Sequence, residues 1–181
     1  NNEKNIPFSE NDPLGGSDIY SSSKTGADIL TQSFYQSFFK NSPTKIAIVR
    51  AGNVIGGGDW KKDRLIPDCL KSVTTNKNII LRNPSFTRPW QHVLEPLSGY
   101  MFVAKKIFYK KTKNYIWNFG PKKTNSIKVI DITKKIISKY KSKSKIIIKI
   151  DKTNKENKYL RLSSLNSNKI LGWKPVWNIN E

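Results

Sequence analysis

The sequence predicts an α/β fold built on a largely parallel sheet, and three observations lead to it. Short apolar runs of strand length alternate with longer segments whose apolar residues recur every three or four positions, the spacing of one helix face. The strand-length runs are apolar at successive positions, as in parallel strands that helices cover on both faces. The 181 residues, of which 36% are hydrophobic and 11% aromatic, suffice for a packed core.

The first part of the chain alternates turn-rich and periodic segments. Asn, Asp, Pro and Gly dominate the beginning, and a residue that can cap a helix follows them. The expected elements are a loop over 1–16, a helix from Ser17 or Asp18 to about Lys40, a strand over 45–50, a glycine-rich loop over 51–62, and a helix from Asp63 to about Val73.

The second part repeats this alternation. A Gly-Pro pair ends one expected strand, and Gly172 stands where a helix commonly stops. The expected elements are a strand over 78–82, a loop over 83–89, a helix over 93–109, a strand over 115–119, a helix that Ser126 caps, a strand over 145–150, a polar loop over 151–158, and a short helix over 164–171.

The net charge of +20 would suit an anionic partner. Base-edge recognition favours Arg, yet only five of the 33 basic residues are Arg, and the Lys residues are spread over the expected helices and loops. The charge therefore fits the codon bias of an AT-rich gene. We expect no nucleic-acid partner, and a basic nucleic-acid-binding module stays as a distant alternative.

Other features disfavour membrane insertion, secretion and a metal site. No run of about 18 apolar residues could span a membrane, and the polar first residues lack the apolar core of a signal peptide. The lone Cys69 and the lone His92 cannot form a metal site rich in Cys and His, so we expect no metal. A cytoplasmic location is expected. Because the first residue is Asn and the sole Met is Met101, we expect a fragment or a processed product.

Tyr20 and Lys24 stand one helical turn apart at the start of the first expected helix. At this spacing the phenol and the ammonium share a helix face. A nearby positive charge favours the phenolate, so Tyr20 could take a proton from a sugar hydroxyl while a hydride leaves the same carbon. Tyr109 and Lys113 repeat the spacing, so spacing alone does not identify a site. The small serines between Tyr20 and Lys24 distinguish the first pair, because they let another molecule approach.

A triple glycine, Gly56-Gly-Gly58, follows the strand expected over 45–50. Ligands of open α/β sheets bind beyond the carboxyl ends of strands, and glycines let the backbone approach a ligand. No Gly-Lys-Ser/Thr follows, so this is not a nucleoside-triphosphate P-loop. Arg grips phosphate through two parallel hydrogen bonds, and Arg64, Arg82 and Arg88 lie near turns or helix starts where one or two of them could clamp a diphosphate.

With these residues the chain resembles the extended short-chain dehydrogenase/reductases, and within them the CDP-glucose 4,6-dehydratases. The triple glycine and the run from Arg88 to Tyr100 are specific to this subgroup, whereas Tyr-x-x-x-Lys is common to the superfamily. The resemblance extends over nearly the whole chain. The matching stretches are 11–16, 20–24, 50–60, 63–68 and 88–100, with weaker ones at 117–120, 159–162 and 171–175.

The resemblance implies a tightly bound NAD and a nucleotide-activated hexose, CDP-glucose, as the substrate. The implied reaction is oxidation at C4, loss of water across C5–C6 and return of the hydride to C6. A related sugar-nucleotide epimerase or reductase is the alternative, and Glu156 and Tyr159 match only loosely. The implied roles are Tyr20 as base on the sugar 4-hydroxyl, Tyr20, Lys24 and Asn53 as cofactor contacts, and Asn53, Arg64, Leu65, Arg88 and Asn118 as substrate contacts.

The resemblance also implies a division of the chain. Residues 1–53 would belong to an NAD-binding Rossmann domain, a doubly wound parallel sheet, and would include the catalytic helix. Residues 54–181 would form mainly a smaller mixed α/β subdomain for the sugar nucleotide, with about 90–120 returning to the Rossmann sheet. The family's glycine-rich phosphate loop and its Thr/Asp/Lys elimination residues would lie before Asn1. We therefore expect the isolated chain to be inactive and the full-length enzyme to be a homodimer that serves polysaccharide biosynthesis.

Overall fold

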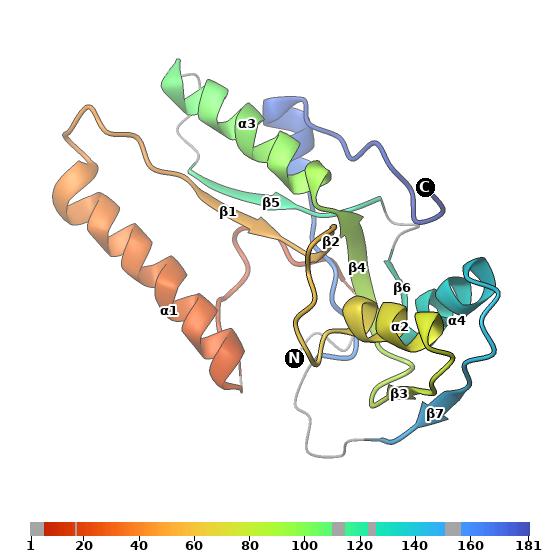
Figure 1. Ribbon diagram of the computed structural model, residues 1–181. Helices are drawn as coiled ribbons and strands as arrows, with labels where there is room; N and C mark the ends of the chain where they lie inside the picture. Colours follow the sequence, from red (N-terminus) through yellow and green to blue (C-terminus); the bar gives the residue numbers. More distant parts are fainter. Residues whose placement is uncertain (1–5, 17, 110–114, 123–125, 151–156) are drawn as a thin grey trace.

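The structure, a computed structural model, describes residues 6–16, 18–109, 115–122, 126–150 and 157–181 (Figure 1). Helices alternate with single strands or with two successive strands, and two π-helical turns, η1 and η3, accompany them. The elements are α1 (Ile19–Phe34), η1 (Tyr35–Phe39), β1 (Ile48–Ala51), β2 (Asn53–Ile55), α2 (Leu65–Thr74), β3 (Ile79–Leu81), β4 (Thr87–His92), α3 (Leu94–Phe108), β5 (Ile116–Phe119), β6 (Ser126–Lys128), α4 (Val129–Lys139), β7 (Ile146–Ile148) and η3 (Ser167–Leu171).

The strands of the described residues form three small sheets. β1 pairs with β5 in parallel, and β3 pairs with β7 in parallel. In the third sheet β4 lies between a parallel neighbour, β2, and an antiparallel one, β6. The predicted α/β class with largely parallel pairing is confirmed.

One extended segment takes part in two of these sheets. β1 ends at Ala51 beside β5, and β2 begins at Asn53 beside β4, so the chain changes partner at Gly52. A Cβ on Gly52 would lie 2.6 Å from Cγ of Pro89, so this close approach requires glycine. The Gln91 side chain of β4 adds a second link, because its Nε2 donates to the carbonyl of Phe119 at 2.9 Å.

Three strands lie where the sequence predicted other structure. β2 lies inside the expected glycine-rich loop, β4 begins inside the loop expected over 83–89, and β6 takes the place of the helix start expected at Ser126. The prediction for β4 was wrong because its sequence, Thr-Arg-Pro-Trp-Gln-His, has no apolar alternation. Packing overrides the local preference there, and every residue of β4 except His92 is buried.

The helix predicted from Ser17 or Asp18 is confirmed. Asp18 is its N-cap, since its carboxylate accepts hydrogen bonds from the Ser21 backbone N–H (2.9 Å) and the Ser21 hydroxyl (2.6 Å). These bonds, above all the one from the hydroxyl, hold the pKa of the Asp18 carboxyl below its ordinary value. The helix reaches Phe39 because the π-helical turn η1 continues α1 without a break.

One cluster of buried side chains lies between α2, β3, α4 and β7. Cys69 belongs to it and is fully buried, so it serves as a small core residue. Burial raises the pKa of its thiol to about 11. The buried members are Cys69, Val73, Ile79 and Leu81.

A second cluster lies between β5, α3 and the segment that follows η3. Its rings pack edge to face, with centroid separations of 4.9 Å for Phe119 and Trp173 and 5.6 Å for Tyr100 and Phe119. Glu95 secures the end of the chain to α3, because its Oε1 accepts hydrogen bonds from the backbone N–H groups of Val176 and Trp177. The buried apolar members are Val103, Trp117, Phe119 and Trp173.

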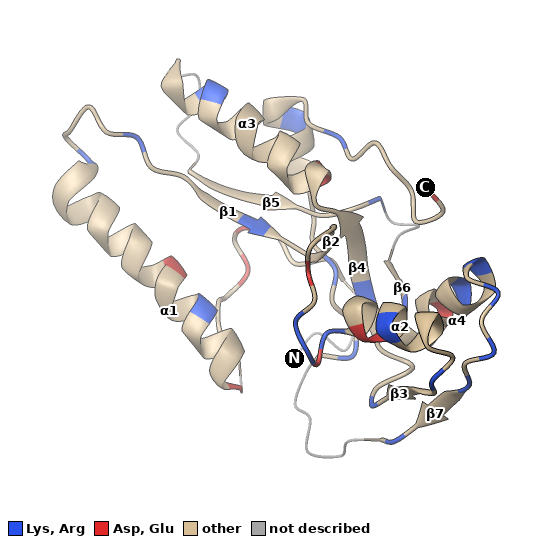
Figure 2. Cartoon of the chain, viewed as in Figure 1, with Lys and Arg blue, Asp and Glu red and all other residues tan. Residues whose placement is uncertain are grey.

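α1 lies outside both clusters. It has no buried residue, and it runs beside β1 as the outermost element on that side of the molecule (Figure 1). Most of its apolar side chains are exposed, among them Ile19, Leu30 and Phe34. Lys and Arg lie on α1, β1, α2, α3 and α4 and on the loops near β3 and β7 (Figure 2). No helix within the described ranges is long and apolar enough to cross a membrane.

Candidate active site

Tyr20 and Lys24 lie in the first two turns of α1, and the structure brings them together. The Lys24 Nζ lies 5.8 Å from the centroid of the Tyr20 ring. The Tyr20 side chain is 72% exposed and Lys24 is also exposed, so both can reach a ligand. The Asp18 cap immediately before them fixes the backbone of the first helical turn through its hydrogen bonds with Ser21.

An ion pair places this pair near the carboxyl end of β1. Arg50 in β1 contacts Asp28 in α1 through Nε and Oδ2 at 2.7 Å. α1 and β1 run in opposite directions (Figure 1), and Tyr20 lies about 12 Å before Asp28 along the helix, at about 1.5 Å per residue. The phenol therefore lies toward the end of β1, where the chain continues into β2 and the triple glycine.

The triple glycine follows β2 directly. A Cβ on Gly56 would come within 2.9 Å of Cγ1 of Val93, so glycine lets β2 and the start of α3 approach each other. Gly58 has a φ of 82°, in the left-handed region that glycine favours. The absence of side chains at Gly56 and Gly58 thus allows this turn. Asn53, half-buried at the start of β2, is the predicted contact residue that lies nearest to the triple glycine along the chain.

Arg64 and Leu65 lie together at the start of α2. Arg64 is the N-cap residue, and its Nη1 pairs with Oδ2 of Asp59 at 3.1 Å. Its side chain is 57% exposed, so a phosphate could replace this carboxylate. Leu65 is half-buried and packs against the first core cluster, which fixes the beginning of the helix.

Arg88 is placed differently from a solvent-facing phosphate clamp. It is 9% exposed, and its Nη1 donates to the carbonyls of Thr87 and Asn157, each at 2.9 Å. Its guanidinium carbon also lies 5.2 Å from the centroid of the Phe86 ring. These contacts tie β4 to the segment near Tyr159, which forms a parallel bridge with Thr87. Glu156, matched loosely with Tyr159, lies outside the described residues.

Asn118 lies opposite Arg50 in the β1–β5 pairing and is 1% exposed. Its Nδ2 donates to the carbonyl of Phe8 at 3.2 Å, and its backbone N–H donates to Oε1 of Glu10 at 2.9 Å. The segment Phe8–Glu10 therefore covers Asn118 on the side away from β1. A ligand could contact the Asn118 side chain only if this segment moved.

Sequence reasoning missed two charged residues that organise this region, Glu10 and Asp28. Glu10 binds Asn118 through one carboxylate oxygen and Asn166 Nδ2 through the other, and its carbonyl accepts from Arg50 Nη1 at 3.4 Å. One signal could have found Asp28. Arg50 ends an otherwise apolar strand, where a charge needs a partner, and Asp28 follows Tyr20 and Lys24 at the same four-residue spacing.

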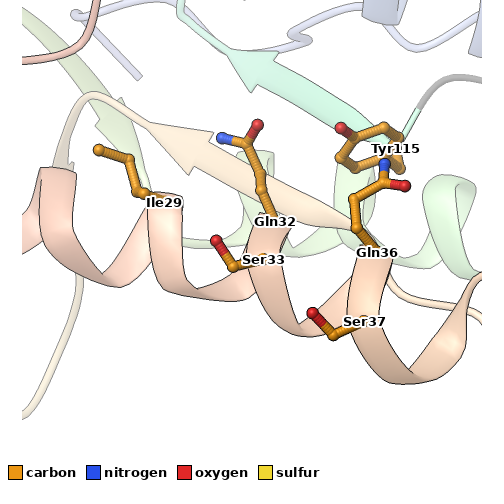
Figure 3. A pocket seen from close by; sticks show the side chains of 6 residues that line it. All are labelled: Ile29, Gln32, Ser33, Gln36, Ser37 and Tyr115. Carbon is orange, nitrogen blue, oxygen red and sulfur yellow. The ribbon is translucent and has the colours of Figure 1, made fainter.

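The surface also has a hollow of about 440 Å³ beside α1, η1 and the start of β5 (Figure 3). It contains none of the predicted site residues. Two Gln and two Ser are among its six lining residues, and the phenol of Tyr115 is its only titratable group, so it lacks the acid–base pair of the candidate site. The lining residues are Ile29, Gln32, Ser33, Gln36, Ser37 and Tyr115.

Comparison with known families gives one partial match. The model described as the GW (Gly-Tryp) dipeptide domain matches residues 103–179, which include Gly172 and Trp173. This is less than half of the chain. The strands in the matched stretch pair with strands outside it, β5 with β1 and β7 with β3. The match therefore does not decide the family.

Comparison with curated proteins is more informative. The chain is 43% identical over 180 residues to the CDP-glucose 4,6-dehydratase of Salmonella typhimurium. The chain is a homologue of this dehydratase. The resemblance to the CDP-glucose 4,6-dehydratases, predicted from the motifs, is confirmed. The alignment covers 96% of this chain and 50% of the dehydratase, so the chain spans about half the length of its relative.

Solved structures agree with the α/β fold of the dehydratase homologue. An epimerase from Methanothermobacter thermautotrophicus has a TM-score of 0.84 at 19% identity, over 97% of this chain and 51% of that one. DesIV, a dTDP-glucose 4,6-dehydratase from Streptomyces venezuelae with NAD and TYD bound, has a TM-score of 0.79 at 16% identity, over 97% and 51%. At these identities the likeness establishes the fold alone, and this chain again covers about half of each structure.

Proposed function

We propose that this chain forms part of an NAD-dependent CDP-glucose 4,6-dehydratase, the part that holds the Tyr20–Lys24 pair and most of the sugar-nucleotide pocket. The observation that carries the proposal is the 43% identity over nearly the whole chain to a dehydratase of that name. The exposed phenol and ammonium at the start of α1 support it, because they supply the acid–base group that oxidation of a sugar hydroxyl needs.

The residues at the start of α1 fit a nicotinamide cofactor. The Tyr20 hydroxyl and the Lys24 ammonium are exposed, and together they offer hydrogen bonds of the kind that ribose hydroxyls form. Asn53 adds an amide near the carboxyl end of β1, where ligands of such sheets bind. NAD bound there would supply the hydride acceptor.

Tyr20 is proposed to hold and move the proton of the sugar 4-hydroxyl. The phenolate oxygen would accept this proton while the hydride leaves C4. Because C4 stays a ketone in the product, the phenol would then release the proton to solvent, which balances the proton taken up by the departing water. Lys24 would bring its positive charge to the same helix face, where its Nζ lies 5.8 Å from the centroid of the Tyr20 ring. Both side chains stand in solvent in the structure, so the rest of the dehydratase fold is needed to exclude water from them.

The sugar nucleotide is proposed to bind beyond the ends of β1 and β2. Arg64 is the most accessible of the predicted guanidinium contacts, and a diphosphate would compete with Asp59 for it. Leu65 and Asn53 would contact the nucleotide and the sugar. Arg88 and Asn118 are proposed to keep their substrate roles only if the segments near Asn157 and Phe8 shift, because both side chains are buried and donate hydrogen bonds to the carbonyls of those segments.

The decisive experiment is incubation of the full-length protein with CDP-glucose and NAD, followed by mass spectrometry of the sugar nucleotide. Loss of one water from the sugar supports the proposal. A product of unchanged mass but different configuration would favour the epimerase alternative, and unchanged CDP-glucose would overturn the dehydratase proposal. The isolated 181-residue chain should give no product, so turnover by it would contradict that expectation.

The remaining expectations belong to the same proposal. The division near residue 53, the homodimer and the cytoplasmic location follow from the resemblance to the dehydratases. Lys and Arg on several elements, rather than on one, support the absence of a nucleic-acid partner. Binding of DNA with micromolar or tighter affinity at low salt, which weakens steeply as the salt concentration rises to the physiological level, would contradict the expected absence of a nucleic-acid partner.

A further inference from the structure

The Arg50–Asp28 pair is the least exposed ion pair among the described residues. The two side chains are 19% and 10% exposed, compared with 36–63% for the side chains of the other two pairs. The second carboxylate oxygen of Asp28 accepts a hydrogen bond from Nε2 of Gln32 at 2.8 Å. α1 has no buried residue, so it lacks a buried apolar face that could pack against β1. The Arg50–Asp28 ion pair therefore fixes the helix against the strand instead.

Asp28 continues the helix stripe that carries the candidate catalytic pair. Tyr20, Lys24 and Asp28 follow one another at four-residue intervals, so Lys24 has the phenol one turn before it and a carboxylate one turn after it. Lys and Asp at this spacing attract each other. In the structure Asp28 instead pairs with Arg50, and the Lys24 Nζ lies near the Tyr20 ring.

We propose that Arg50 and Asp28 are positioning residues for the Tyr20–Lys24 pair, an inference that rests on the proposed function. Arg50 has two effects. It holds α1 in one rotation against β1, and it occupies the carboxylate that would otherwise draw the Lys24 ammonium away from the phenol. Its Nη1 also donates to the carbonyl of Glu10, so the same guanidinium joins the segment before α1 to β1.

The two effects can be separated in the full-length protein. Arg50→Gln removes the anchor and frees the carboxylate, so kcat for CDP-glucose should fall by on the order of 10–100-fold while KM changes little. Arg50→Gln combined with Asp28→Asn also removes the anchor but leaves no carboxylate to compete for Lys24. The double variant should therefore have a higher kcat than Arg50→Gln alone. A double variant no faster than the single one would overturn the competition for Lys24.

Asp63→Asn is the matched control. Asp63 contacts Nη2 of Arg82 at 2.6 Å, a pair as short as Arg50–Asp28, but the two side chains are 63% and 54% exposed and lie outside α1 and β1. Asp63 has a φ of 65°, which Asn also tolerates. This variant should keep the parent kcat. A kcat loss equal to that of Arg50→Gln would mean that any broken ion pair has the same effect, and would overturn the inference.

Hydrogen exchange gives a readout that does not need turnover. The amides of α1 should exchange at least several-fold faster in Arg50→Gln than in Asp63→Asn, because only the first change releases the helix. Equal exchange in the two variants would overturn the anchoring role. If Arg50→Gln does not fold, Arg50→Lys keeps the charge and should show intermediate exchange. A parent protein that leaves CDP-glucose unchanged would refute the proposed function instead, and the exchange comparison would still decide the anchor.

Discussion

Replacing Gly99 by Ala should destabilise the protein, although alanine is the better helix former. Gly99 lies inside α3, where a Cβ would come within 2.2 Å of Cε1 and 2.3 Å of Cδ1 of Phe119. Carbon atoms in contact prefer about 3.5–4.0 Å, so the ring would have to move by about 1 Å or more. Phe119 has little room to move, because it is fully buried against Tyr100 and Trp173.

The expected loss of stability in Gly99→Ala is the difference between two opposing effects. Overpacking of a core costs about 1–3 kcal/mol, and the gain in helix propensity from Gly to Ala is at most about 1 kcal/mol. With the full propensity gain subtracted, we therefore expect the free energy of unfolding to fall by up to about 2 kcal/mol. Gly26→Ala is the matched control, since Gly26 also lies in a helix but its Cβ would meet nothing within 4 Å. It should raise the free energy of unfolding by about 0.5–1 kcal/mol. Urea unfolding measures both, and stabilisation by both changes would refute the clash.

Three further changes test the site and the first core cluster. Tyr20→Phe in the full-length protein should lower kcat for CDP-glucose by about 10²–10⁴-fold, because the proton acceptor is lost, and steady-state kinetics would expose an error if kcat stayed within a factor of two or so. Leu81→Ala should cost about 2–5 kcal/mol of unfolding free energy because Leu81 is 1% exposed, whereas Ile80→Ala should cost far less because Ile80 is 55% exposed; similar costs in urea unfolding would contradict the strand orientation. Burial raises the pKa of the Cys69 thiol from 9.0 to about 11, so the unfolded chain loses this proton first, and the thiol's contribution to stability is full below pH 9 and lost between pH 9 and about 11. Thermal melts of the parent and Cys69→Ala across this range should diverge, and parallel curves would contradict the assignment.

The elements with clear periodicity could be predicted from the sequence. The helix after Asp18, the strand around Val49 and the strand around Trp117 lie where their patterns indicate, because their local preferences agree with the packing. β4 could not be predicted in this way. Arg88 and Gln91 are polar yet buried in it, and their side chains bond to carbonyls that are distant in the sequence, Asn157 and Phe119.

The candidate site was predictable in part for a similar reason. Tyr20 and Lys24 are close in the sequence, so helix periodicity alone brings them together. Arg50 and Asp28 are separated by 22 residues, and Glu10 and Asn118 by 108. Such contacts depend on how β1, β5 and the first segment are arranged, which no local pattern encodes. The resemblance located Arg88 and Asn118 in the sequence, but only the structure reveals that both are buried and that each donates a hydrogen bond to a backbone carbonyl distant in the sequence.

The change of partner at Gly52 has a consequence for cooperativity. Two hydrophobic clusters in one chain could in principle melt in separate calorimetric transitions. Here a single stretch of backbone, β1 followed by β2, belongs to one sheet before Gly52 and to the next sheet after it. Loss of β5 would remove the strand that pairs with β1. Because β2 follows β1 directly, its pairing with β4 would then also be weakened. The fold around the second cluster and the sheet centred on β4 should therefore melt as one unit, with coincident heat-absorption and tryptophan-fluorescence midpoints.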